Sequence, residues 1–371
     1  MRRFIGRSVP MVIRLLFAAF AVALCQLAAT PPRSAIAQAE ALVAGADPAE
    51  REELGEALGL ALVRQGRTGE AEKLAATLPP VRHAAVILAL AERLPTLESA
   101  RAGQFLLEAQ TDRALIRDWH KSRIARLLAV GHARLGRLEA AEAMAREVPD
   151  AEDRAFALRD VVFELCRAGE ITRARELAAA IEENRRYGTY RQKAAALSAV
   201  SSLLQSRGDA EGAATLLAQA ELLLPKKPGW SDGGALLSVG VAAHACGQTD
   251  KAGELFNRAG ALARGIGGAW KVSELTAVAA AWRDVGEKAR AAELLAEAET
   301  LLAALPASER APEALALARA HAAADNAGKA RTLVAEALAE ALREEKTGSG
   351  RAAQVRALLA WAEITGEAAV P

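Results

Sequence analysis

The stretch RGDAEGAATLLAQAELLLP, Arg207 to Pro225, carries a spacing that recurs along most of the chain. Its glycine, Gly208, is followed five residues later by Ala213, and then by Leu217 and Ala220. The same glycine-to-alanine spacing occurs at Gly66 with Ala71, Gly136 with Ala141, Gly169 with Ala174, Gly247 with Ala252 and Gly286 with Ala291, and Asp325 with Ala330 continues the series. The turn positions from Gly169 to Asp325 are evenly spaced, so the stretch is one copy of an internal repeat.

Amphipathic segments flank each of these glycines. AAALSAVSSLLQSRG precedes one turn and DKAGELFNRAGALA follows another, and in both the apolar residues recur at intervals of three and four, which predicts helices. Glycine can adopt the left-handed conformation that ends the first helix. We expect a polar residue after it, such as Asp209 or Thr249, to cap the second helix.

The recurring alanine marks the closest approach of two helices, and Leu217, Phe256 and Leu295 fill the seam beside it. One helical hairpin cannot bury its own apolar side, so the copies must stack on one another. The interval from Gly66 to Gly136 has room for two copies, and LESARAGQFLLEAQ fits the second helix of a degenerate one. The pattern predicts an all-α fold of about eight stacked hairpins plus a terminal helix over residues 50–371.

These residues resemble the tetratricopeptide repeat family. LGLAL at Leu58–Leu62 matches the first helix of its pattern, and FNRA at Phe256–Ala259 matches the second. The resemblance implies a right-handed α-solenoid of helix-turn-helix units, although the evenly spaced copies after Gly169 are longer than the family's usual repeat. Sel1-like repeats are the nearest rival, but their second glycine pair is missing.

The N-terminus reads as an export signal. Four arginines precede the apolar run LLFAAFAVALCQLAA, and Ala35 with Ala37 forms a small-x-small cleavage site. We expect a signal peptide at 1–37 cleaved after Ala37, a short linker at 38–49, and a periplasmic or secreted protein without a transmembrane domain. The alternative is an uncleaved N-terminal anchor.

The charge of the chain argues against nucleic-acid binding, and the positions of its cysteines argue against a disulfide. Residues 1–37 hold five arginines and no acid, which leaves 42 basic and 46 acidic residues in the remainder of the chain. A mildly acidic body gives no electrostatic reason to expect nucleic acid. Cys166 and Cys246 lie two repeats apart, so we expect two separate thiols although an exported protein meets an oxidising compartment.

No motif in the sequence indicates catalysis. The five histidines form neither H-x-x-x-H nor H-E-x-x-H, C-x-x-C is absent, and no glycine-rich loop follows a strand. We therefore expect a non-enzyme without cofactor or metal. An enzyme whose groups come together only in the fold remains an alternative.

The resemblance to the tetratricopeptide family implies a concave groove lined by first-helix positions that recur once per repeat. The family's carboxylate clamp is not implied, because the matching positions lack its lysines and asparagine. A mixed polar and apolar groove suits a peptide segment, although these side chains could also be merely solvated. The candidate groove residues are Arg126, Arg159, Phe163, Ser202, Gln205, His244, Arg283 and Arg319.

A second recurrence concerns aromatic residues, which make up only 4% of the chain. Trp119, Tyr190, Trp230 and Trp270 each lie near the expected start of a first helix, at nearly the same distance before a turn glycine. One interpretation is packing between successive repeats. The other is an exposed aromatic ridge able to stack on sugars or anchor a protein.

The sequence thus favours an envelope scaffold that binds a peptide segment or another envelope protein through the solenoid surface. The alternative function is a glycan-binding module in polysaccharide or cell-wall handling that uses the aromatic ridge.

Overall fold

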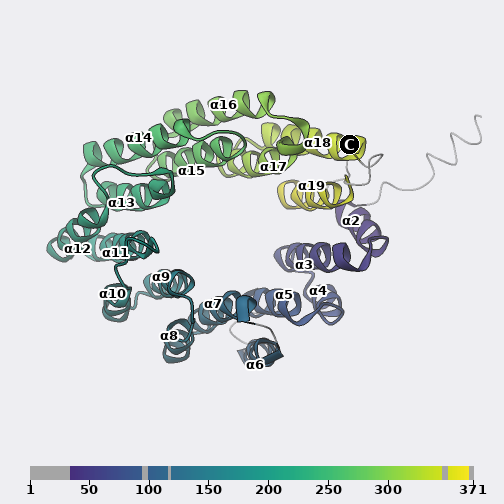
Figure 1. Ribbon diagram of the computed structural model, residues 1–371, viewed down its shortest axis with the longest axis horizontal. Helices are drawn as coiled ribbons and strands as arrows, with labels where there is room; N and C mark the ends of the chain where they lie inside the picture. Colours follow the sequence, from purple (N-terminus) through teal and green to yellow (C-terminus); the bar gives the residue numbers. More distant parts are fainter. Residues whose placement is uncertain (1–33, 94–98, 116–117, 345–349, 367–371) are drawn as a thin grey trace, which may run out of the picture.

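The computed structural model describes residues 34–93, 99–115, 118–344 and 350–366. Within these ranges the chain forms α-helices, one short 3-10 helix and no strand, which confirms the predicted all-α class. The helices follow one another around a closed ring, with one helix of each hairpin on the inside and the other on the outside (Figure 1). The repeat pattern therefore builds a solenoid whose two ends meet.

Within the described ranges, eight hairpins and a terminal helix are present, as the sequence predicts. Helix α2 (Ala35–Ala44) precedes them, α19 (Gly350–Thr365) follows them, and the 3-10 helix η2 (Trp230–Asp232) leads into the sixth hairpin. The inner and outer helices of successive hairpins are α3 (Pro48–Arg64) and α4 (Thr68–Ala75), α5 (Pro80–Arg93) and α6 (Ser99–Leu115), α7 (Asp118–Arg134) and α8 (Leu138–Arg146), α9 (Ala151–Ala168) and α10 (Ile171–Ala180), α11 (Thr189–Ser206) and α12 (Ala210–Leu223), α13 (Gly233–Ala245) and α14 (Thr249–Gly265), α15 (Trp270–Asp284) and α16 (Lys288–Ala304), and α17 (Ala307–Ala323) and α18 (Ala327–Glu344).

The recurring glycines all lie at the bends between inner and outer helices. Each has a positive φ, between 71° at Gly136 and 87° at Gly208 and Gly286, and Asp325 takes the same conformation with φ 60°. At Gly208 the turn forms two backbone hydrogen bonds to the end of α11. The amide of Gly208 donates to the carbonyl of Gln205, and the amide of Asp209 donates to the carbonyl of Leu204. The predicted turn position is confirmed at all seven sites.

The predicted capping residues behave differently. The side chain of Asp209 accepts a hydrogen bond of 2.8 Å from the amide of Gly212 and caps α12. The expectation for Thr249 is wrong, because Gln248 occupies the cap position of α14 and makes no side-chain cap hydrogen bond. Thr249 instead is the first residue inside the helix.

The recurring alanines and the larger residues beside them are buried throughout the ring. Where the two helices of a hairpin face each other, a large side chain on one helix lies opposite a small residue on the other. Gly240 of α13 accommodates Phe256 of α14, because a Cβ at Gly240 would lie 2.5 Å from the Phe256 ring. In α9 and α10 the corresponding residues are Val162 and Ala178, both fully buried, so the larger side chain there stands on the inner helix. Close packing forces this reciprocity, since extra volume on one helix needs less on its neighbour.

The ends of the chain together make a ninth unit. Helix α19 packs against both α2 and α3, in the way that an inner helix packs against its outer helix and the next inner helix elsewhere in the ring. Arg351 of α19 pairs with Glu50 of α3 at 3.3 Å, and Arg356 pairs with Glu53. The ring in Figure 1 is therefore closed by a hairpin whose two helices come from opposite termini.

Helix α2 occupies most of the segment expected to be a linker. Its cap, Ser34, accepts from the amide of Ala37, and Ala35 and Ile36 are fully buried. The cleavage point expected after Ala37 lies within this helix, while residues 1–33 of the expected signal lie outside the described residues. None of the described helices has the length and apolar character needed to cross a membrane.

Cys166 and Cys246 are both free and half-buried. Burial raises the pKa of the Cys166 thiol to about 11. Cys166 therefore stays protonated at neutral pH and is a poor nucleophile.

Two histidines, the half-buried His132 and the buried His321, are expected to make the stability of the ring depend on pH. Burial lowers the pKa of His132 and of His321, and at His321 it outweighs Glu299, whose Oε1 lies 2.8 Å from the imidazole. The unfolded chain therefore binds protons more readily, so this stability is present above about pH 6.5 and is lost as the pH falls toward the folded-state pKa values. We expect the urea midpoint to fall between pH 7.5 and 5.5. The double replacement His132→Asn with His321→Asn should flatten this dependence, and an unchanged slope would contradict it.

Candidate functional site

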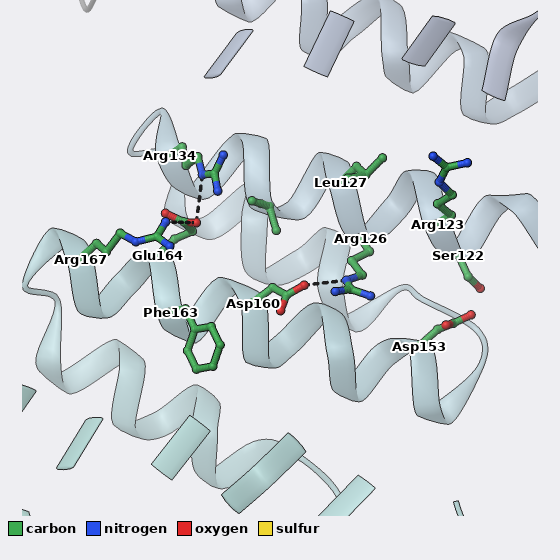
Figure 2. Close-up of a pocket in the computed structure, with 11 residues that line it drawn as sticks. Ser122, Arg123, Arg126, Leu127, Arg134, Asp153, Asp160, Phe163, Glu164 and Arg167 are labelled. Atoms are coloured by element: carbon green, nitrogen blue, oxygen red, sulfur yellow. Dashed lines mark hydrogen bonds and ion pairs between the residues drawn. The ribbon is translucent and has the colours of Figure 1, made fainter. Parts of the chain in front are cut away.

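The inner helices carry the strongest candidate for a binding surface. Residues of α7 and α9 line a hollow of about 700 Å³, and this hollow contains two of the predicted groove residues, Arg126 and Phe163. Figure 2 shows Arg123 and Ser122 at one end of the hollow and Phe163 toward the other. The repeat places these side chains together because each inner helix contributes the same face.

Arginine and carboxylate side chains alternate along this hollow. Arg126 Nε lies 2.6 Å from Asp160 Oδ2, a contact drawn in Figure 2. Arg159 donates to the same carboxylate at 2.7 Å and to Gln192 at 2.6 Å. Its guanidinium also lies 5.5 Å from the centre of the Phe163 ring. The arginine side chains are thus held in fixed positions before any ligand arrives.

A second cluster surrounds Glu164, whose carboxylate is buried on α9. Arg134 of α7 donates to it at 2.9 Å, and Arg167 donates at 2.5 Å from the next turn of α9. Arg123, at the other end of the hollow, pairs with Glu56 of α3, which also accepts from Arg82 at 2.9 Å.

The lining of the hollow carries a small excess of positive charge. Four arginines and three carboxylates line it, Arg123 has its partner Glu56 outside the lining, and the side chain of Arg167 remains 66% exposed. An anionic group entering from solvent could therefore reach a guanidinium that keeps unused donors.

A second hollow, of about 330 Å³, adjoins the first through Phe163. Mostly small and apolar side chains of α11, α13 and α15 line it, including Ser202, Leu237 and Val241, together with the carboxylate of Asp284. Ser202 donates to the backbone of its own helix, at Ser198 O, over 3.1 Å. The inner surface therefore changes from charged to apolar at Phe163.

The remaining predicted groove residues lie on inner helices but line neither hollow; among them, Arg159 reaches the first hollow only through Asp160 and Phe163. Gln205 and His244 are half-buried near the ends of α11 and α13. Arg283 pairs with its neighbour Asp284 at 2.6 Å, and Arg319 pairs with Glu363 of α19 at 3.1 Å. The structure thus concentrates the site at α7 and α9.

The four recurring aromatic residues do not form one exposed ridge. Trp230 and Trp270 are 68% and 70% exposed and line a common pocket. Tyr190 follows the packing interpretation and not the exposed ridge, because its ring is buried and its hydroxyl donates to the buried carboxylate of Asp232. The side chain of Trp119 lies outside the described residues.

Sequence reasoning missed several residues of the first hollow. The spacing of Arg123, Arg126 and Arg134 places them near one face of α7, while Asp160, Glu164 and Arg167 share a face of α9 at intervals of four and three. Arginines on one inner helix and carboxylates at matching positions of the next could have predicted this charged hollow from the sequence. In the described part of the chain, no group of three potential metal ligands is assembled.

Among known proteins, similarity to this chain was found only in solved structures of low sequence identity. No protein-family model and no curated protein matches the chain. Among solved structures, a Rap protein complexed with the competence and sporulation factor is 14% identical, with a TM-score of 0.32 over 86% of this chain and 100% of that one. Ton1535 from Thermococcus onnurineus NA1 is also 14% identical, with a TM-score of 0.28 over 86% and 94%. The helical-repeat architecture therefore rests on this chain's own structure.

Proposed function

We propose that the protein is a scaffold that binds a segment of a partner protein along its inner helices, between α7 and α15. The observation that carries this proposal is the junction at Phe163, where a hollow rich in arginine meets an apolar one. A peptide with an acidic part followed by an apolar part would match both halves. Anchoring by an aromatic side chain and by arginines is typical of the residues that dominate protein interfaces.

Preorganisation supports the same proposal. The guanidinium groups of Arg126 and Arg159 are already held by Asp160, so a ligand would not have to order them. Binding energy is lost when long side chains must be immobilised, and here much of that loss has occurred during folding.

The cell envelope is the proposed location, and the proposed partner is another envelope protein. The support is the N-terminal sequence, in which arginines precede a short apolar run and a small-x-small site. Cleavage after Ala37 would give a mature chain that begins inside α2 and lacks the buried Ile36.

The test is capture of partners by the purified protein from an envelope extract, followed by calorimetry with the acidic and apolar segment of the recovered protein. We expect Phe163→Ala and Arg167→Ala each to weaken binding about tenfold, because truncation of an interface anchor typically costs more than about 1 kcal/mol. Arg258→Ala is the matched control, since Arg258 lies on the outer helix α14, away from both hollows. Equal losses in all three variants, or none, would contradict the proposed site.

Glycan binding is the second candidate function. It is favoured by the exposure of Trp230 and Trp270, whose flat faces could stack on sugar rings. The buried Tyr190 shortens the surface available for it, and a carboxylate, Glu274, lines the pocket beside the two indoles.

A further inference from the structure

A pocket of about 500 Å³ lies where the sixth and seventh hairpins meet, away from the two inner hollows. Trp230 of η2 and Trp270 at the start of α15 contribute their indoles to it, and Glu274 lies one turn further along α15. The rest of the lining is apolar or backbone, from residues such as Pro228, Leu262 and Ile266.

The loop that carries Trp230 is fixed from both sides. Asp232 accepts from the amide of Gly229 at 2.7 Å and from the hydroxyl of Tyr190, and Arg191 donates to Ser231 at 2.6 Å. The two exposed indoles therefore project from anchored backbone. An exposed aromatic pair on a rigid frame loses little conformational freedom when a ligand binds between its members.

Glu274 is a carboxylate without a counter-charge. Within the described ranges it makes no hydrogen bond or ion pair, although most acidic side chains on neighbouring helices do. Burial raises its pKa, and no cation offsets that effect. Lys271, on the same helix, acts on Glu297 instead. Folding has thus left a half-buried carboxylate without a partner beside two indole side chains.

We propose that this pocket binds a quaternary ammonium group, with Trp230 and Trp270 against its methyl groups and Glu274 opposite its charge. Indole faces attract cations through their ring quadrupole, and trimethylammonium groups are the ligands that aromatic cages recognise. The carboxylate adds an attraction that the low-dielectric surroundings strengthen.

The lining distinguishes this ligand from two others. A primary ammonium such as that of lysine is strongly hydrated and would need hydrogen-bond acceptors for three N–H groups, whereas the pocket offers one carboxylate side chain. A neutral sugar could stack on the indoles, but it would leave the charge of Glu274 without compensation. A methylated cation satisfies both features, because it carries charge and needs no hydrogen bonds.

The test is calorimetric titration of the purified protein with choline and with 3,3-dimethylbutanol, its uncharged counterpart of the same shape. We expect saturable binding of choline and binding of the alcohol that is at least about tenfold weaker. Glu274→Gln should weaken choline binding about tenfold, and Trp230→Ala or Trp270→Ala should remove it. These three side chains are exposed or half-buried, so the variants should keep the wild-type circular dichroism spectrum.

Two matched controls accompany these variants. Glu254→Gln removes an exposed carboxylate from α14, and Leu222→Ala truncates an apolar side chain that is 80% exposed on α12. Both should bind choline like the wild type. Equal affinity for choline and the alcohol, or an unchanged affinity in Glu274→Gln, would overturn the proposal.

Parallel titrations identify the source of the ammonium group. Binding of free choline without association with phosphatidylcholine vesicles would indicate a soluble quaternary amine, and association with the vesicles would indicate a lipid headgroup; both support the proposed chemistry. Tighter binding of an oligosaccharide or of Nα-acetyl-lysinamide than of choline would overturn it, in favour of a glycan or a basic peptide.

Discussion

Phe256→Ala should destabilise the protein by about 3–5 kcal/mol, which is the usual cost of truncating a buried phenylalanine. The ring is fully buried on α14 and contacts α15 through Trp282, with ring centroids 4.9 Å apart and planes at 69°. This edge-to-face contact contributes about 0.5–1.5 kcal/mol beyond the buried area. The glycine opposite, Gly240, has no side chain that could fill the resulting space.

Urea denaturation followed by circular dichroism measures this effect. Leu222→Ala is the control, because its exposed side chain should change stability by less than about 0.5 kcal/mol. A second comparison tests the volume argument itself. Gly240→Ala should cost about 1–3 kcal/mol in the wild type, where the new Cβ meets the Phe256 ring, but much less in the Phe256→Ala background. Additive costs would show that the two positions do not share one space.

Deleting residues 345–371 should open the ring. The deletion removes α19, which supplies one half of the terminal hairpin and contacts α2, α3, α17 and α18. Its buried face includes Val355, Leu358, Leu359 and Trp361, so the apolar faces of its neighbours would become exposed to water. We expect the radius of gyration measured by small-angle X-ray scattering to increase, and we expect the amides of α2 to lose protection from hydrogen exchange.

Ile36→Ala provides the matched thermodynamic test of ring closure, in protein produced without export so that residue 36 is retained. Ile36 is fully buried on α2, so the replacement should cost about 2–5 kcal/mol in the chain that retains α19. In the truncated chain α2 has lost this partner, and the same replacement should cost almost nothing. Amides of α11, on the far side of the ring, should keep their protection in both chains. Unchanged protection of α2 after the deletion would show that α19 does not hold it.

Ring closure also bears on the proposed function. In an open solenoid the inner helices could spread to admit a partner, as successive units rotate slightly against one another. A closed ring resists such spreading, because every unit has a neighbour on both sides. The first hollow is therefore expected to bind its ligand with little change in backbone, which agrees with arginines already held by carboxylates.

The repeat was predictable from sequence because its determinants are local or lie in adjacent units. A turn that needs a positive φ selects glycine at 208, and a close helix crossing selects alanine at 213. Each requirement recurs with every copy, so seven positions carry the same signal. Even the degenerate copy could be placed, and Leu106 is buried in α6 as its phase predicts.

The binding residues were only partly predictable, because their surroundings differ between copies. Tyr190, Trp230 and Trp270 share one repeat position, yet only Tyr190 has a buried carboxylate, Asp232, within reach of its ring substituent. Phe163 was identified from the repeat, whereas the ion pairs that line its hollow depend on which charges face each other across α7 and α9. Period alone does not encode these pairings.

The sequence by itself determined the unit: a helix, a left-handed turn, a second helix, and the small and large residues through which one unit packs on the next. Tertiary structure alone decided that the array closes. Closure joins Arg351 to Glu50 across almost the whole chain. Closure depends on the total of the small rotations between neighbouring units around the ring, and the sequence of one repeat does not determine that total.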